Sequence, residues 1–406
     1  MNSTAHQSIQ KYLKSYSNDL LNDSIDDPRL KNLKWCFVLV VPVCGESPSF
    51  LDDLLIHQRI ESILTVMVVN RPTEHDKSAQ WFTENQLLIE RLNFDAESKV
   101  ELSKQHHLLL NVNGHDVMLL DFNDQPFDHR KGVGLARKIG ADTALKMIQL
   151  NWISNPWIFS TDADVELPID YFSVVNKTNH NQSAICLDFV HSGSDPKLCD
   201  YQNQYDFKLR YYQQGMKYIG SKYDYIPLGS TLIIEASAYA KVRGFPSRSG
   251  GEDFYILNKL AKVGGIYQPK MPKVKIKIRL SDRVPFGTGP AISQIKQLEQ
   301  QGGGYKLYHP DCFYIIKQWR DDLLNYFDHQ KLPHSDCGLN DCWHIGHVLE
   351  NGFKQSKSHQ RWQQFIHEWF DAFKILKSVH FLSESLPVIS QLELLRMQRY
   401  QEIAGC

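Results

Sequence analysis

The sequence predicts an α/β protein in which helices flank a mostly parallel central sheet, followed by a helical C-terminal extension. Trp35 to Val43 and Ile63 to Asn70 are apolar runs, typical of strands that are buried on both faces. A stretch with helical periodicity, 48–62, separates them, so the chain begins β-α-β and implies a right-handed crossover. Beyond residue 290 the recognisable periodicity is helical.

Strand and helix signals alternate through the middle of the chain. Asn113-Gly114 is a tight-turn signal that predicts a hairpin, and glycines open a helix over 132–148. A buried strand is expected over 156–167. Further strands are expected at 183–193 and 273–283, and helical segments at 78–108, 168–178 and 200–218. We therefore expect an N-terminal helical leader over 1–33, an α/β domain over 34–288 and a mostly helical region over 289–406.

The composition excludes some classes of function. Lys and Arg number 45 against 46 Asp and Glu, a neutral balance that argues against a dedicated nucleic-acid binder. The polar N-terminus lacks the basic start and apolar run of a signal peptide, and no apolar stretch approaches the ~20 residues that cross a bilayer. We expect a cytoplasmic protein whose contact with the inner face of a membrane is at most peripheral.

The C-terminal region carries two features with more than one interpretation. Cys337 and Cys342 are close enough in sequence for a zinc site, but free thiols in a helical segment are the preferred interpretation. Trp362, Phe365 and Trp369 recur at helical spacing. Core packing is the preferred interpretation of this stripe. The alternatives are a surface for an acceptor, for a membrane, or for a second copy of the chain in a homo-oligomer.

Two aspartates, Asp162 and Asp164, end the apolar run that begins at Trp157. Residues two apart in an extended chain point to the same side, and the carboxyl ends of parallel strands border the crevice where such sheets bind ligands. Two neighbouring carboxylates repel each other, and a divalent cation removes that cost. Mg²⁺ or Mn²⁺ takes such oxygen ligands and completes its shell with substrate phosphates. An ordinary acidic turn is the alternative.

A second acidic pair, Glu252 and Asp253, follows Gly250 and Gly251 and begins a predicted helix. Carboxylates at a helix start are favoured by the helix dipole, so a structural cap is one interpretation. The other is a general base, which has to lie within hydrogen-bond reach of an attacking hydroxyl. The residues alone leave both open.

Two basic residues, Arg137 and Lys138, lie near the start of the glycine-rich helix at 132–148. The glycines match neither a Walker phosphate-binding loop nor a dinucleotide-binding fingerprint. The two cations can meet a phosphate or a base. A solvated basic helix face is the alternative.

Four motifs, taken together and in order, resemble those of the family 2 glycosyltransferases. They are VVPVCGE, GVGLARKIGADTA, STDADVEL and the block from Gly229 to Gly265 that contains the Glu-Asp pair. The resemblance covers about residues 35–285. It implies a GT-A fold, a nucleotide-diphosphate sugar donor, Mg²⁺ or Mn²⁺, and inversion at the anomeric carbon by direct displacement.

The resemblance also implies roles for individual residues. Asp253 would be the catalytic base, with Glu252 as its neighbour toward the acceptor. Asp164 would ligate the metal directly, with Asp162 near the ribose or the metal, and His191 is a further candidate ligand. The candidates for binding the nucleotide sugar are Pro42, Glu46, Asn70, Arg137, Asp162 and Ala163. Arg283 is a further candidate neighbour of the phosphates or of the metal.

The expected reaction is the addition of one hexose-like sugar to a glycan, a lipid-linked molecule or a small molecule, as in glycan or surface-polysaccharide assembly. The processive synthases of the family carry membrane helices and a Q-x-x-R-W motif, which this chain lacks. The chain departs from the family's pattern at four positions, Cys44, Gly45, Asn70 and Lys138. The usual residues are an aromatic–Asn pair for the first two, Asp for Asn70 and Asn for Lys138.

Two other functions are weighed against this one. A sugar-nucleotide pyrophosphorylase carries a glycine-rich, basic loop after its first strand, whereas PVCGESPSF has one glycine and no Lys or Arg. A catalytically degenerate domain that binds a nucleotide sugar or serves as a scaffold would fit the four departures. The intact Asp162–Asp164 and Glu252–Asp253 pairs argue against that alternative.

Overall fold

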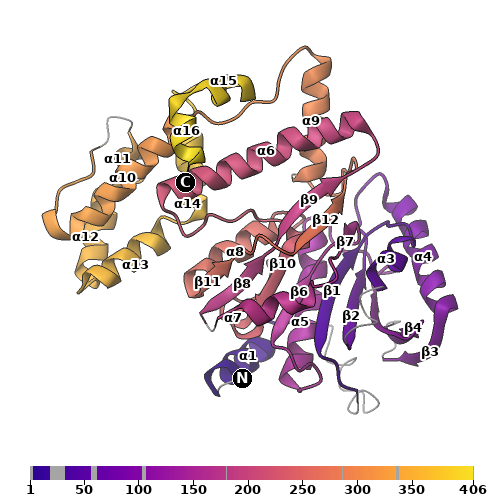
Figure 1. Cartoon of the computed structure of the whole chain (residues 1–406). Coiled ribbons are helices and arrows are strands. Elements are labelled where there is room, and N and C mark those ends of the chain that lie inside the picture. The colour runs from indigo at the N-terminus through magenta and orange to yellow at the C-terminus, as the bar shows by residue number, and fades with distance from the viewer. Residues whose placement is uncertain are drawn as a thin grey trace. The chain divides into compact units, whose positions relative to one another are not determined.

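The computed structural model describes residues 3–18, 33–55, 62–102, 107–179, 181–285, 287–334 and 338–405. The chain divides into two compact units (Figure 1). The sheet unit comprises Met1–Cys199 and Pro227–Pro290, and the helical unit comprises Asp200–Ile226 and Ala291–Cys406. A segment from the middle of the chain therefore groups with the C-terminal region.

A mixed sheet forms the core of the sheet unit, so the predicted α/β fold class is confirmed. Among the described residues, its strand order is β11-β8-β10-β6-β1-β2-β5-β4-β3. The four central strands β5, β2, β1 and β6 run parallel. They span His115–Asp121, Ile63–Val69, Phe37–Val43 and Trp157–Ser160 respectively. The outer strands are β3 (Ala96–Glu101), β4 (Leu108–Val112), β8 (Gln182–Cys186), β10 (Leu232–Glu235) and β11 (Gly265–Tyr267).

The two apolar runs of the N-terminal half form the centre of this sheet. All seven residues of β2 are buried, and β1 pairs with β2 over its whole length, from Phe37 opposite Ile63 to Val43 opposite Val69. Helix α5 (Gly132–Gln149) packs on β1, β2 and β6. The other helices of the sheet unit are α1 (Ser3–Ser15), α3 (Phe50–Leu55), α4 (Ser78–Asp95), α7 (Ala236–Lys241) and α8 (Glu252–Val263).

The strand order places a ligand-binding edge between β1 and β6. Strands β2 to β5 all lie on one side of β1, and the chain then crosses to the other side of β1 with β6. In open α/β sheets, ligands bind outside the carboxyl ends of the strands at the point where the order reverses. Here that point is bordered by the residues after Val43 and after Ser160, which include Glu46, Asp162 and Asp164.

A small second sheet continues directly from the two aspartates. Its order is β7 (Val165–Glu166), β12 (Lys273–Lys277) and β9 (Asp188–Ser192). The backbone N–H of Lys277 donates to the carbonyl of Asp164 at 3.0 Å, so the residues after β12 begin beside the aspartates. The prediction of one strand over 183–193 is wrong, because β8 and β9 belong to different sheets and are separated by Leu187.

Three local predictions differ in outcome. The hairpin is confirmed, with β4 and β5 antiparallel around Asn113 and Gly114, whose φ angles are 52° and 82°. The helix expected over 78–108 ends at Asp95, because the chain continues into β3, which pairs antiparallel with β4. The segment expected to be helical over 168–178 contains a 3-10 helix, Phe172–Lys177.

The helical unit confirms the helical periodicity beyond residue 290. Its helices include α6 (Pro196–Ile219), α9 (Thr288–Gln300), α10 (Pro310–His329), α11 (Leu339–Cys342), α12 (Ile345–Gln355), α15 (Gln391–Arg396) and α16 (Gln398–Ala404). The aromatic stripe lies on α13 (His359–Trp369). A separate helix, α14 (Ala372–Leu382), follows, and Asp371 caps it by accepting from the N–H of Lys374. Trp362 is fully buried and donates to the carbonyl of Leu323, which fits core packing.

For three further predictions, the structure describes only some of the residues concerned. The N-terminal leader is helical over Ser3–Ser15, and residues 19–32 lie outside the described part of the chain. The interpretation of the Cys337–Cys342 pair stays a prediction, because Cys337 lies outside the described part of the chain. No helix in the described ranges is both long enough and apolar enough to cross a membrane.

Candidate active site

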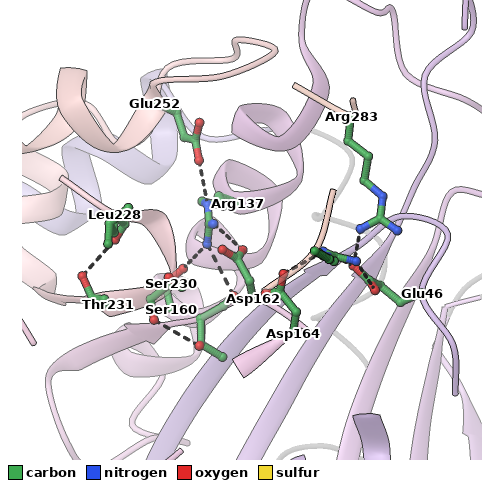
Figure 2. Close-up of polar contacts among 12 residues, drawn as sticks. Glu46, Arg137, Ser160, Asp162, Asp164, Leu228, Ser230, Thr231, Glu252 and Arg283 are labelled. Atoms are coloured by element: carbon green, nitrogen blue, oxygen red, sulfur yellow. Dashed lines mark hydrogen bonds and ion pairs between the residues drawn. The ribbon is translucent and has the colours of Figure 1, made fainter. Parts of the chain in front are cut away.

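Acidic side chains from three parts of the sequence border the reversal point of the sheet. Glu46 follows β1, Asp162 and Asp164 follow β6, and Glu252 begins α8 (Figure 2). Arginines stand among them, so the site is a set of alternating negative and positive charges rather than an acidic cluster.

Arg137 holds the two acidic motifs together from helix α5. Its Nε donates to Glu252 Oε1 at 2.8 Å, its Nη1 donates to Ser160 Oγ at 2.9 Å, and its Nη2 pairs with Asp162 Oδ1. The side chain is only 3% exposed, so the alternative of a solvated helix face is wrong for this residue. Burial alone lowers the pKa of Arg137, but Asp162 and Glu252 raise it, and the guanidinium stays charged. The guanidinium donors of Arg137 therefore bind side chains of this chain.

The glycine-rich start of α5 allows the loop before α8 to pass close by. The N–H of Gly134 donates to the carbonyl of Arg248 at 2.9 Å. A Cβ atom at Gly134 would lie 2.5 Å from the carbonyl oxygen of Pro246, which is closer than real Cβ contacts allow. The glycines that match no phosphate-binding loop thus have a packing role, and they position the Glu252–Asp253 pair.

The Glu252–Asp253 pair is not a side-chain cap of helix α8. The N-cap residue is Gly251, with φ at 70°, and it makes no side-chain cap hydrogen bond. Glu252 is buried and reaches Arg137 instead. Asp253 Oδ1 accepts from the N–H of Phe254 at 2.7 Å. Burial and the nearby charge of Glu252 raise the pKa of Asp253 to about 7, which is suited to a general base at neutral pH.

A second group of charges joins the ends of β1 and β6. Arg279 donates to both carboxylate oxygens of Glu46 at 2.8 Å, and its Nη2 lies 2.8 Å from Asp164 Oδ2. Arg283 also pairs with Glu46 and donates to the carbonyl of Gly45 at 2.6 Å. Burial raises the pKa of Asp164 to about 6, although Arg279 opposes the shift.

Sequence reasoning missed Arg279, although a signal for it was present. Lys275, Lys277 and Arg279 alternate along and just beyond β12, so their side chains share one face. The two lysines pair with Glu166 and Asp53, and the arginine is the member of the row that reaches the strand ends. A basic residue at every second position from Lys275 to Arg279 was the pattern that indicated a row of ion pairs.

Gly45, one of the departures from the family's pattern, has a structural reason. Its φ is 60°, and a Cβ atom there would lie 2.1 Å from Trp81 Cδ1. Its N–H donates to Oδ1 of the buried Asn85 at 2.8 Å. The turn after β1 therefore requires glycine at this position, and the Gly45 carbonyl accepts a hydrogen bond from Arg283.

The other predicted donor-binding residues lie at the same edge and are buried. Asn70 is 4% exposed, and its Nδ2 donates to the carbonyls of Val43 and Val68 at 3.1 and 3.3 Å. Its amide nitrogen thus ties β1 to β2 rather than facing a base. Pro42 is buried within β1, and Ala163 is 5% exposed between the two aspartates.

Lys138, the departure on helix α5, anchors the N-terminal helix. Its Nζ lies 3.0 Å from Asp142 Oδ2, and it donates to the Tyr12 hydroxyl. The Tyr12 hydroxyl donates to Asp142 Oδ1 at 2.6 Å, and Tyr239 donates to the same oxygen at 2.8 Å. The lysine therefore belongs to a buried network that fixes α1 on the helix carrying Arg137, and it is not a solvated basic face.

His191 does not join the two aspartates in a ligand group. It lies on β9 opposite Ile276 of β12, whose other neighbour is Val165, so it is two strand spacings, or roughly 10 Å, from β7. No group of three His, Cys, Asp or Glu side chains that could hold a metal occurs within the described ranges. Asp164 attracts a cation, Arg279, and its charge interacts with Asp162. The two carboxylates fit Mg²⁺ or Mn²⁺ if phosphate oxygens complete the shell.

Comparison with known proteins finds similarity at the level of structure only. No protein-family model matches the sequence, and no curated protein matches it. Glucosyl-3-phosphoglycerate synthase from Mycobacterium tuberculosis, in complex with Mn²⁺, UDP and glucosyl-3-phosphoglycerate, is 10% identical, with 68% of this chain and 85% of that chain covered and a TM-score of 0.34. The complex of that synthase with phosphoglyceric acid is 9% identical, with coverage of 67% and 81% and a TM-score of 0.33.

The bifunctional glycosyltransferase WbbM is a further similar structure, 11% identical, with 59% of this chain and 39% of that chain covered and a TM-score of 0.29. Similarities with TM-scores of 0.34 or less carry no argument about the function of this chain. The functional argument therefore rests on the geometry of the site.

Proposed function

We propose that this chain is an inverting glycosyltransferase that moves one sugar from a nucleoside-diphosphate donor to an acceptor hydroxyl. The observation that carries the proposal is the Arg137 network. It joins Asp162, at the end of β6, to Glu252, ninety residues later, at the edge where open α/β sheets bind ligands. The two motifs that resemble those of the family thus form one site.

The donor side of the site is the end of β1 and β6. Asp162 and Asp164 would hold Mg²⁺ or Mn²⁺ together with the donor's diphosphate. When bound, such an ion neutralises negative charge on the departing nucleoside diphosphate. Arg279 and Arg283, which pair with Glu46 at the same edge, are cations of the chain itself within this region. Glu46 keeps both guanidinium groups at the strand ends.

The acceptor side of the site is the start of α8. Asp253 accepts the proton of the acceptor hydroxyl as that oxygen bonds to the anomeric carbon and the bond from that carbon to the diphosphate breaks. A pKa of about 7 leaves the carboxylate ionised at slightly alkaline pH while making it more basic than an ordinary aspartate. Glu252 does not take this role, because its carboxylate is bound to Arg137. One base and one displacement give inversion.

A screen of nucleotide sugars with release of the nucleoside diphosphate as readout tests the proposal. The wild-type chain should consume one donor class in the presence of Mn²⁺ and an acceptor mixture. Asp253→Asn should lower the transfer rate by about 10²- to 10⁴-fold and keep donor binding. Asp170→Asn, which changes an exposed aspartate before the 3-10 helix, is the matched control and should keep full activity. Full activity in Asp253→Asn would place the base elsewhere, and no donor consumption by the wild type would reject the function.

A further inference from the structure

The Asp164 carboxylate already has a cation of the chain beside it. Arg279 Nη2 lies 2.8 Å from Asp164 Oδ2, while the same guanidinium donates to both oxygens of Glu46. A divalent ion ligated by Asp164 would stand next to this guanidinium, and like charges at that separation repel. Arg279 and a divalent ion therefore compete for Asp164.

Arg279 is the most exposed member of its ion-pair group, since the side chains of Glu46 and Asp164 are 14% and 18% exposed. Its side chain is 34% exposed, and it lies beyond the end of β12 rather than on a helix. Glu46 would keep a partner if Arg279 left Asp164, because Arg283 pairs with it as well. The charge that would remain without a partner is the guanidinium of Arg279 itself.

A diphosphate is a suitable new partner for that guanidinium. Arginine presents a planar fork of donors that matches phosphate oxygens, and a bound ion brings phosphates to Asp164. Neither lysine of the same row is placed in this way, since Lys275 and Lys277 pair with Glu166 and Asp53.

We propose that Arg279 is the counter-ion of Asp164 in the donor-free enzyme, that a divalent cation displaces it, and that the released guanidinium binds the diphosphate of the donor. The last step rests on the proposed function, whereas the competition with the cation does not. Divalent cation and diphosphate then bind cooperatively, because each favours the state in which Arg279 has left Asp164.

The competition is tested with Mn²⁺ alone, measured by the electron paramagnetic resonance signal of the free ion with full-length protein. Arg279→Gln should bind Mn²⁺ about tenfold tighter than the wild type or more. Lys275→Gln removes one positive charge from the same face without touching Asp164 and should stay within about twofold of the wild type. Asp164→Asn added to Arg279→Gln should abolish the gain. If Arg279→Gln binds Mn²⁺ no more tightly than the wild type, or neither binds it, the proposal is overturned.

A second variant covers the case in which Arg279→Gln does not fold. Arg279→Lys keeps the charge but loses the fork, and its affinity for Mn²⁺ should lie above that of the wild type by a smaller factor. An affinity at or below the wild-type value would contradict the competition.

The cooperative step is tested by thermal unfolding with Mn²⁺, inorganic pyrophosphate and both. In the wild type the two together should raise Tm by more than the sum of the separate shifts, and in Arg279→Gln the excess over that sum should be smaller, because only the direct contact between ion and phosphate remains. An additive response in the wild type would overturn this step. Since no sugar donor is used, loss of the proposed transfer reaction in the donor screen and failure of these binding results are separate outcomes.

Discussion

Two arginines neutralise the two aspartates at the end of β6, and they do so from different surroundings. Arg137 is 3% exposed on a helix that packs on the sheet, and its donors meet Glu252, Ser160 and Asp162. Arg279 is 34% exposed on the segment after β12 and meets Glu46 and Asp164. Arg137 is thus part of the folded core, whereas Arg279 is partly exposed to solvent.

The difference teaches how two neighbouring carboxylates can have separate roles. Breaking a buried ion pair leaves a charge without compensation, which is costly, whereas exposed pairs contribute little. Asp162, 33% exposed, pairs with a buried arginine that also holds Glu252, whereas Asp164, 18% exposed, pairs with a partly exposed arginine that exchanges for a divalent ion under the proposal. The predictions below test this division, beginning with the largest expected effect.

Arg137→Met should lower the free energy of unfolding by about 3–5 kcal/mol, because it leaves the buried Glu252 without its partner. Chemical denaturation measures the effect. The double variant with Glu252→Gln is the control and should recover part of the loss, since no buried charge then remains. A loss below about 1 kcal/mol in the single variant would mean that the Arg137 group is not part of the core.

The transfer rate at subsaturating donor should fall about tenfold per pH unit below pH 7 and level off above it. Asp253 has its pKa raised to about 7 by burial and by Glu252, and it acts only as the carboxylate. Asp164, whose pKa burial raises to about 6, should add a second decline below that pH. Initial rates from pH 5 to 9 provide the measurement. A rate independent of pH over this range would contradict the assignment of Asp253.

Tyr12→Phe should lower the free energy of unfolding by about 1–3 kcal/mol, because Asp142 loses a hydrogen bond inside the network that fixes α1 on α5. Tyr16→Phe, on the same helix region and 38% exposed, is the matched control and should change it by less than about 0.5 kcal/mol. Equal effects of the two substitutions would show that the network does not support the helix of Arg137.

Arg279→Gln should lower the free energy of unfolding by about 1–2 kcal/mol, less than Arg137→Met does, because Arg279 is 34% exposed and Arg283 still pairs with Glu46. Denaturant titration beside Arg137→Met gives the comparison directly. A loss as large as that of Arg137→Met would show that both arginines belong to the core, and the proposed exchange at Asp164 would then be untenable.

Local patterns predicted the central strands and their order of appearance because apolar runs and turn residues act over short distances. The runs at Trp35 and Ile63 became β1 and β2, and the Asn113–Gly114 turn joins β4 and β5. The placement of β9 in a separate sheet was missed because it depends on pairing with β12, in which Asp188 lies opposite Lys273. Strand β3 was missed although it pairs with the next strand, β4, because its sequence AESKVE is polar and mostly exposed.

The part of the candidate site that could be predicted is the part in which neighbouring residues of one motif fix the positions of the side chains. Two residues after a parallel strand indicate a ligand-binding edge, so Asp162 and Asp164 could be proposed from the sequence. The partners of these aspartates could not be proposed in the same way. Arg137 and Arg279 are 25 and 115 residues away from the aspartate that each meets, and ion-pair partners at such separations are set by the fold.

The most direct test of the donor site is nucleotide binding by the full-length chain and by Asp164→Asn. Thermal unfolding is followed with ADP, CDP, GDP, UDP and dTDP, each with Mn²⁺. One nucleoside diphosphate at about 100 times its Kd should stabilise the wild type by about 2.7 kcal/mol, and the same mixture should leave Asp164→Asn unchanged. Stabilisation by none of the five, or equal stabilisation of both proteins, would contradict the assignment of this strand end as the donor site.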